Sequence, residues 1–99
     1  MNYRFTIEAR VDLMAAAAFY DSQRAGLGAE FTVDVGLAIA RVLDGPKRWG
    51  EIEAGFRKYR MNRFPFALIY RIPAPNLVEI VSVFDQRRRP GSWRGNAKP

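Results

Sequence analysis

The fold is decided by the stretch Phe56-Arg-Lys-Tyr-Arg-Met-Asn-Arg-Phe-Pro-Phe-Ala-Leu-Ile-Tyr-Arg-Ile72, which predicts two strands joined by a tight connection. In its first half the side chains alternate, so that Lys58 and Arg60 share one face and Tyr59 and Met61 the other. Cations on a rigid strand indicate a surface that meets something anionic. The alternative interpretation is a solvated face of the sheet, and the stretch alone leaves both open.

The break between the two strands falls at Asn62 to Pro65, since proline has no amide donor and a fixed φ. The second strand, Phe66 to Ile72, alternates again and is rich in aromatic and β-branched residues. A turn over Pro73–Asn76 precedes Leu77 to Phe84, whose nearly continuous apolar run predicts a central strand covered on both sides.

Upstream, the pattern predicts one strand and two helices. Tyr3 to Ala9 alternates as a half-buried first strand, and helical spacing begins at Val11. The first helix carries its apolar stripe at Leu13, Ala16, Ala17 and Tyr20. After the turn Asp21–Gly28 comes a second stripe, which runs through Leu27, Phe31, Val35, Ala38, Ile39 and Val42. This helix ends near Asp44-Gly45-Pro46, and 47–55 is predicted as a loop anchored by Trp49.

The predicted fold class is therefore α+β. An N-terminal strand leads into a helical hairpin, followed by a three-stranded antiparallel meander (β-α-α-β-β-β), with the helices on one face of a small sheet. The 99 residues are expected to form a single domain, 1–99.

Composition excludes several kinds of chemistry. The chain has no cysteine and no histidine, which excludes disulfides, thiolate or imidazole metal sites and histidine-based catalysis within it. We expect no cofactor and no metal. With no apolar signal core at the N-terminus and no run of membrane-spanning length, we expect a cytoplasmic protein that does not enter a membrane.

Charge is unevenly distributed along the chain. Residues 1–54 carry six Lys/Arg against eight Asp/Glu, a balance of −2, whereas residues 55–99 carry ten against two, a balance of +8. The net charge of +6 therefore belongs to the sheet half, which indicates an acidic partner: nucleic acid or an acidic protein surface.

Several short motifs give the chain a family resemblance. In order, they are Asp12-Leu13, Phe19-Tyr20-Asp21-Ser-Gln23 with Gly26-Leu27-Gly28 and Phe31, Pro46, Phe56-Arg57, Arg63-Phe64-Pro65-Phe66 with Ile69-Tyr70-Arg71, and Arg87-Arg88-Arg89-Pro90 with Trp93. Together they cover almost the whole chain, which resembles toxins of the RelE/ParE superfamily from bacterial type II toxin–antitoxin systems. The resemblance implies a cytoplasmic growth inhibitor, a role in plasmid stabilisation, and a cognate antitoxin that binds it in a hetero-oligomer.

The resemblance implies two different targets. RelE-like members cut messenger RNA on the ribosome with cationic groups, whereas ParE-like members bind DNA gyrase. Lys58 and Arg60 match the nuclease pattern, but a strand arginine of some nucleases appears here as Ala67. The histidine that often follows the last strand appears as Asp85, and the C-terminal tyrosine as Trp93.

Neither the histidine nor the tyrosine that usually serves as the acid–base residue is present. Whether the chain is an enzyme therefore stays open, and we favour the interpretation that it is not. An aspartate beside Arg87 and Arg88 is expected to have a depressed pKa. Gyrase inhibition is favoured over the alternative of ribosome-dependent RNA cleavage. A non-toxic, basic nucleic-acid-binding module is the third class that the sequence leaves open.

Candidate site residues follow from the same resemblance. The target-binding candidates are Lys58, Arg60, Arg87, Arg88 and Trp93, and the antitoxin-binding candidates are Phe31, Arg57 and Arg71. For Trp93, packing on the domain's own edge is an equal alternative, and Arg57 could instead pair with Glu51 or Glu53. We expect an acidic antitoxin to lay a helix across the helical hairpin and an extended segment against the sheet.

Overall fold

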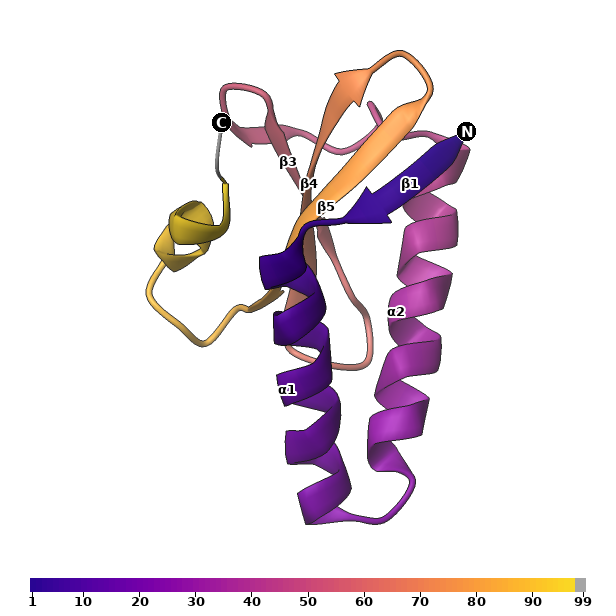
Figure 1. Cartoon of the computed structure of the whole chain (residues 1–99), viewed down its shortest axis with the longest axis vertical. Coiled ribbons are helices and arrows are strands. Elements are labelled where there is room, and N and C mark those ends of the chain that lie inside the picture. Colours follow the sequence, from indigo (N-terminus) through magenta and orange to yellow (C-terminus); the bar gives the residue numbers. More distant parts are fainter. Residues whose placement is uncertain (98–99) are drawn as a thin grey trace.

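The computed structural model describes residues 1–97, so the last two residues of the predicted domain lie outside it. Its elements are β1 (Asn2–Phe5), α1 (Ile7–Gln23), α2 (Leu27–Asp44), β2 (Glu51–Glu53), β3 (Phe56–Arg60), β4 (Phe66–Ala74), β5 (Leu77–Asp85) and the 3₁₀-helix η1 (Ser92–Asn96). Figure 1 shows the two helices side by side as a hairpin beside the twisted sheet. The predicted α+β class and its element order are confirmed.

The sheet has five strands in the order β1-β5-β4-β3-β2. β3, β4 and β5 form the predicted antiparallel meander, and β1 adds in parallel to β5, which is therefore an inner strand. β4 runs further than predicted, to Ala74, because the ladder shifts register between Arg71 and Ala74 around Pro73. The short edge strand β2 was missed, since three residues give no readable alternation.

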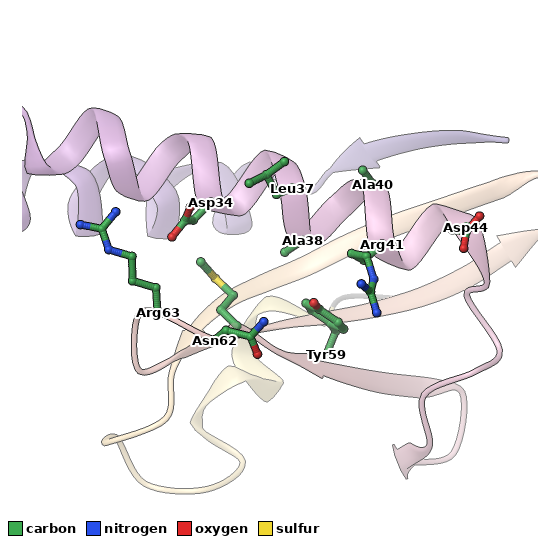
Figure 2. Close-up of a pocket in the computed structure, with 10 residues that line it drawn as sticks. Asp34, Leu37, Ala38, Ala40, Arg41, Asp44, Tyr59, Asn62 and Arg63 are labelled. Carbon is green, nitrogen blue, oxygen red and sulfur yellow. The ribbon is translucent and has the colours of Figure 1, made fainter.

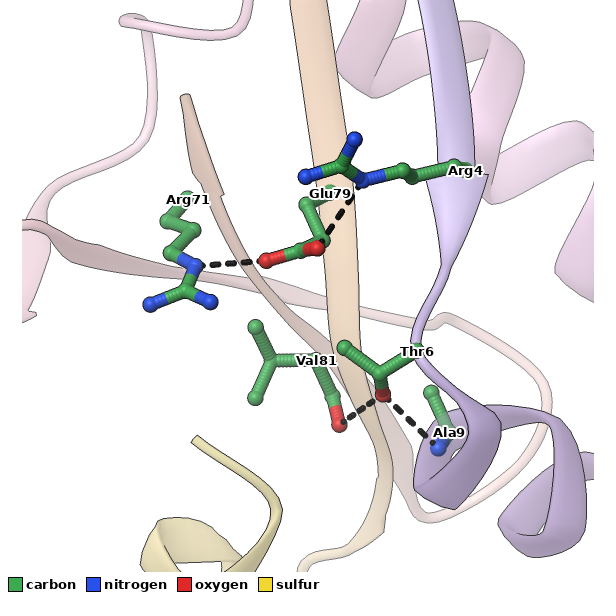
Figure 3. Close-up of polar contacts among 6 residues, drawn as sticks. All are labelled: Arg4, Thr6, Ala9, Arg71, Glu79 and Val81. Carbon is green, nitrogen blue, oxygen red and sulfur yellow. Dashed lines mark hydrogen bonds and ion pairs between the residues drawn. The ribbon is translucent and has the colours of Figure 1, made fainter. Parts of the chain in front are cut away.

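The predicted boundary between the first strand and the first helix is wrong. The strand ends at Phe5, and Thr6 caps the helix: its hydroxyl accepts a hydrogen bond from the Ala9 amide at 3.0 Å and donates to the Val81 carbonyl at 3.3 Å (Figure 3). Alternation through Ile7 was misleading, because Ile7 is 80% exposed and Ala9 is buried. A threonine cap followed by helix therefore overrides the strand pattern.

A buried carboxylate ties three strands together. Glu79 on β5 accepts from Arg4 Nε of β1 at 2.9 Å and from Arg71 Nε of β4 at 2.6 Å (Figure 3). Burial acts to raise the pKa of Glu79, but the hydrogen bonds from Arg71 and Arg4 outweigh it, so the pKa lies below its ordinary value. The charged carboxylate thus fixes the register of β1 beside β5.

The main core lies between the sheet and the helical hairpin. The predicted stripe of α2 is buried as expected at Phe31, Val35, Ala38, Ile39 and Val42. Phe31 contacts Tyr20, Phe64 and Phe66, with ring centroids 4.9 to 5.3 Å apart. The helices approach closely because a Cβ on Gly28 would lie 2.3 Å from the Ala17 carbonyl oxygen.

The opposite face of the sheet carries a smaller core of four buried residues, Ile69, Val81, Phe84 and Trp93. Trp93 belongs to η1, which crosses this face after β5. Asp12 of α1 holds η1 in place, since one of its oxygens accepts from Asn96 Nδ2 at 3.0 Å, as well as from Ser82 Oγ and the Val83 amide. Burial raises the pKa of Asp12 against these hydrogen bonds.

Candidate functional site

A cationic cleft lies on the sheet face that the helices leave open. We define it by Lys58 and Arg60 of β3, Arg88 after β5, and Arg94 and Glu53 at its rim. Its volume is about 300 Å³, and Ile69, Phe84 and Trp93 contribute its apolar lining. The alternation predicted for β3 places both cations here, because Tyr59 faces the helices instead.

Backbone pairing of β3 with β4 positions Lys58 and Arg60. They stand opposite Ile69 and Ala67 in the register of β3 with β4. Within residues 1–97 neither cation forms an ion pair, whereas Arg94 is bound by Glu53 at 2.9 Å. Because the carboxylate of Glu53 in the same cleft is bound by Arg94, the charges of Lys58 and Arg60 leave this face ready to bind an anion.

Trp93 does not extend this surface. The ring is only 5% exposed and packs on Phe56, with the ring centroids 5.1 Å apart. The sequence left packing on the domain's own edge as an alternative for Trp93, and this alternative describes its position. Trp93 anchors η1 and cannot stack on a base from solvent.

Arg87 lies apart from the cleft. Its guanidinium binds Asp85 with two hydrogen bonds of 2.9 Å, at the end of β5 and beside a separate depression lined by Phe19 and Phe66. These hydrogen bonds lower the pKa of Asp85, as expected from the sequence. Arg88 lines both the cleft and this depression, so the structure brings Arg88, but not Arg87, to Lys58 and Arg60.

The cleft is poor in groups that exchange a proton near neutral pH. Among the described residues that line it, Glu53 is the sole carboxylate, and Arg94 neutralises it. Tyr70 faces the helices, donates its hydroxyl to the Pro46 carbonyl at 2.6 Å, and has a pKa raised by burial to about 12. Asp85 is committed to Arg87. The arrangement can hold a polyanion, but it supplies no evident general acid or base.

A second concave surface lies between α2 and β3, on the helix side of the sheet. This groove, of about 550 Å³, is lined by Asp34, Leu37, Ala38, Ala40, Arg41, Asp44, Tyr59, Met61, Asn62 and Arg63 (Figure 2). Leu37 is 62% exposed, so the groove presents apolar surface to solvent with charged residues at its margins. Such a shape accommodates an amphipathic helix.

The edge of β3 connects the groove to the cleft. β2 pairs only with Phe56 and Arg57, which leaves the outer edge of Lys58–Arg60 without a neighbouring strand in the described chain. A depression at this edge is lined by Arg41 and Tyr59, which also line the groove, and by Lys58 and Arg60, which also line the cleft. One extended segment can therefore reach both surfaces across a strand edge that is open to pairing.

The three antitoxin-binding candidates are not gathered in one place. Phe31 is fully buried and therefore cannot contact a partner in this conformation. Arg71 is bound to Glu79, and Arg57 donates to the carbonyls of Trp49 at 2.6 Å and Lys47 at 3.3 Å, rather than to Glu51 or Glu53.

The groove itself was missed from the sequence. The available signal was Leu37, an apolar residue of α2 that lies off the buried stripe. Its exposure marks a second, solvent-facing apolar strip on that helix.

Of the comparisons with known proteins, the one with solved structures bears on the fold. No family model and no curated protein matches the sequence. Among solved structures, the chain is similar to one of the chromosomal ParDE TA (toxin–antitoxin) system from P. aeruginosa, with a TM-score of 0.75 and 17% identity over 86% of this chain and 95% of that one. At this identity the likeness shows the fold. No helix within residues 1–97 is long and apolar enough to cross a bilayer.

Proposed function

We propose that this protein is the toxin of a type II toxin–antitoxin system, that it acts in the cytoplasm by inhibiting DNA gyrase, and that a cognate antitoxin neutralises it. The fold shared with a chain of a ParDE system supports the toxin class. The observation that carries the choice of target is the cationic cleft, which presents Lys58 and Arg60 without a proton-exchanging partner.

A binding surface fits this cleft better than a nuclease site. RNA cleavage by attack of a 2′-hydroxyl gains about 10²–10⁴-fold from positioned acid–base groups. Lys58 and Arg60 could stabilise charge on a phosphate, but the arginine, histidine and tyrosine expected of a nuclease are replaced by Ala67, Asp85 and Trp93. Ala67 and Trp93 are buried, and Asp85 is paired with Arg87. Binding to gyrase needs none of these replaced groups.

Neutralisation follows from the connected surfaces. An antitoxin helix in the groove would lie along the second helix of the hairpin and bury Leu37 and Tyr59. An extended segment that continues from it would pair with the open edge of Lys58–Arg60. Acidic side chains on that segment would then reach the cationic cleft and cover the surface that binds the target.

The test compares two purified reactions with the same preparation of the chain. We expect inhibition of gyrase supercoiling, relieved when the product of a neighbouring antitoxin gene is added, and no cleavage of mRNA on translating ribosomes. Cleavage of ribosome-bound mRNA with unimpaired gyrase would establish the RelE-like alternative. If the chain shows neither activity but binds free nucleic acid, it belongs among the non-toxic binding modules.

In cells, induced expression should stop DNA synthesis and raise DNA-damage signalling before protein synthesis falls. The order of these events separates the two targets, because a ribosome-dependent nuclease stops translation first. A catalytically dead variant that still binds ribosomes fully would contradict the gyrase proposal.

A further inference from the structure

The depression at the open edge of β3, called here the edge depression, has a charge that selects its occupant. Its volume is about 470 Å³, and the residues that line it are Arg41, Trp49, Gly50, Ile52, Lys58, Tyr59, Arg60 and Asn62. This described lining contains three cations and no carboxylate. Within residues 1–97, Arg41, Lys58 and Arg60 form no ion pair. An occupant that carries negative charge is therefore favoured.

The backbone at this edge offers both hydrogen-bond donors and acceptors. The Met61 amide donates to the Phe66 carbonyl of β4 at 2.9 Å. Because hydrogen-bonding groups alternate in direction along an antiparallel strand, the amides and carbonyls of Lys58 and Arg60 point away from β4, toward the open edge. A polypeptide strand can pair with both kinds of group, whereas a phosphodiester backbone offers acceptors alone and leaves the carbonyls without donors. The edge therefore favours a polypeptide over a nucleic acid.

The two sides of β3 present different chemistry to such a strand. Lys58 and Arg60 project onto the cleft side, and Tyr59 between them projects toward the helices. In a pair of strands, residues that lie directly opposite each other have their side chains on the same face of the sheet. The residues opposite Lys58 and Arg60 would therefore enter the cationic cleft, and the residue between them would lie on Tyr59.

The surroundings of Tyr59 are suited to an apolar side chain. The Tyr59 ring packs edge-on against Trp49, with the ring centroids 4.8 Å apart. The groove continues from Tyr59 over Ala38 and Met61, which are apolar as well. Arg41 extends from α2 toward β3 beside this position (Figure 2), where its guanidinium can contact the face of an aromatic ring. An aliphatic or aromatic residue thus fits between the two positions that face the cations.

The spacing of the two cations fixes the spacing of the acids. Both strands of a pair rise by about 3.3 Å per residue, so two carboxylates two residues apart can each stand opposite one cation of β3. The resulting sequence pattern is an acidic residue, an apolar residue and a second acidic residue, which we call the triplet. The triplet is the same in either direction, so it suits a parallel or an antiparallel strand.

We propose that the open edge of β3 binds an extended polypeptide segment that carries the triplet, with its two acids on Lys58 and Arg60 and its apolar residue on Tyr59. Through this segment the antitoxin covers the cationic cleft, a role that rests on the proposed function. Recognition of the triplet itself follows from the edge, the cations and the rings of this chain, and it does not depend on the identity of the target.

The test is an NMR titration of the full chain with two capped synthetic peptides of identical composition, Thr-Glu-Leu-Glu-Thr and Thr-Glu-Glu-Leu-Thr. The first peptide should shift the amide signals of Lys58, Tyr59 and Arg60 and saturate in the millimolar range. The second places one carboxylate on the wrong side of the strand and should bind about tenfold more weakly, as expected for one lost charged contact. Thr-Glu-Ser-Glu-Thr, which lacks the apolar residue, should also bind more weakly than the first.

A charge reversal provides the matched control. The double variant Lys58→Glu/Arg60→Glu should lose the triplet peptide and should instead bind Thr-Lys-Leu-Lys-Thr. Binding of the lysine peptide at the same amides would show that the variant is folded and that the register is kept. Arg10→Glu, which reverses an exposed charge on α1, should bind the triplet peptide as the parent does.

Equal affinity for the two isomeric peptides, or a lysine peptide that binds the double variant no better than the parent, would overturn the proposal. A single-stranded oligothymidylate that binds the same amides more tightly than the triplet peptide would assign the edge to nucleic acid and overturn it too. These results are separate from the gyrase assay. A chain that selects the triplet but leaves gyrase unimpaired would keep this inference and refute the target, whereas a gyrase inhibitor that binds both isomers equally would do the reverse.

Discussion

On one face of the sheet two helices cover a continuous apolar core. On the other face the short helix η1 places Trp93 on three hydrophobic residues of the sheet, beside Lys58 and Arg60. The first face is filled by large interlocked rings such as Phe31 and Phe64. The second combines a small core with cations that have no ion-pair partner in the described chain. Stability thus depends chiefly on the covered face, which leaves the open face available for binding.

The largest effect is expected from truncation on the covered face. Phe31→Ala removes a fully buried ring that contacts three others, and should lower the free energy of unfolding by about 3–5 kcal/mol. The matched change on the open face, Phe84→Ala, should lower it by less, because η1 can collapse onto the smaller cluster. Urea denaturation of both variants measures the difference. Equal losses would contradict the contrast between the faces.

A smaller loss is expected where α1 is tied to the open face. Asp12→Ala leaves the buried Val83 amide and Ser82 without their acceptor, and should cost about 1–3 kcal/mol. Asp12→Asn keeps an acceptor oxygen and should cost less. Denaturation of the two variants in a Trp49→Phe background, where fluorescence reports Trp93 of η1 alone, separates the lost hydrogen bonds from the lost charge. Identical behaviour would show that the hydrogen bonds contribute little.

Only part of these two faces could be predicted from the sequence. The stripe of α2 and the alternation of β3 are periodic, so Phe31, Ile39, Lys58 and Arg60 were placed on the correct faces. The start of the first helix was placed too late because Thr6 ends the strand by capping, and a single cap leaves no period to read. β2 is too short to show alternation.

The site was less predictable than the fold. Nothing local distinguishes a tryptophan that anchors η1 from one that stacks on a ligand, and Trp93 is settled only by its contact with Phe56. The groove arises from α2 and β3 together, far apart in sequence, and the separation of Arg87 from Arg88 depends on how the chain leaves β5.

Two carboxylates should respond to pH in opposite directions. Burial raises the pKa of Asp12, so the folded state holds its proton more tightly, and the contribution of Asp12 to stability falls as pH rises from 3.8 through the higher native pKa. The hydrogen bonds of Arg87 lower the pKa of Asp85 below its ordinary value of 3.8. The contribution of Asp85 to stability is therefore complete above pH 3.8 and is lost as the pH falls through the lower native pKa. NMR titration of the carboxyl carbons checks both directions. A native pKa of Asp12 below that of Asp85 would be inconsistent with the burial found here.

The smallest effect on stability is expected in the cationic cleft itself. Lys58→Ala and Arg60→Ala each remove a cation that forms no ion pair in the described chain, so the free energy of unfolding should change by no more than about 0.5 kcal/mol. Thermal denaturation is a sufficient measurement. A loss comparable to that of Asp12→Ala would mean that these cations hold the fold together.

The most direct test of the account is the affinity for gyrase of Lys58→Glu and Arg60→Glu, measured beside Arg10→Glu, which reverses an exposed charge on α1. If the cleft binds the target, each cleft variant should lose about tenfold or more in affinity, since a charged interfacial contact contributes about 1.5–3 kcal/mol. Arg10→Glu should bind as the parent does, and all three should remain folded. Full gyrase affinity in both cleft variants would contradict the account.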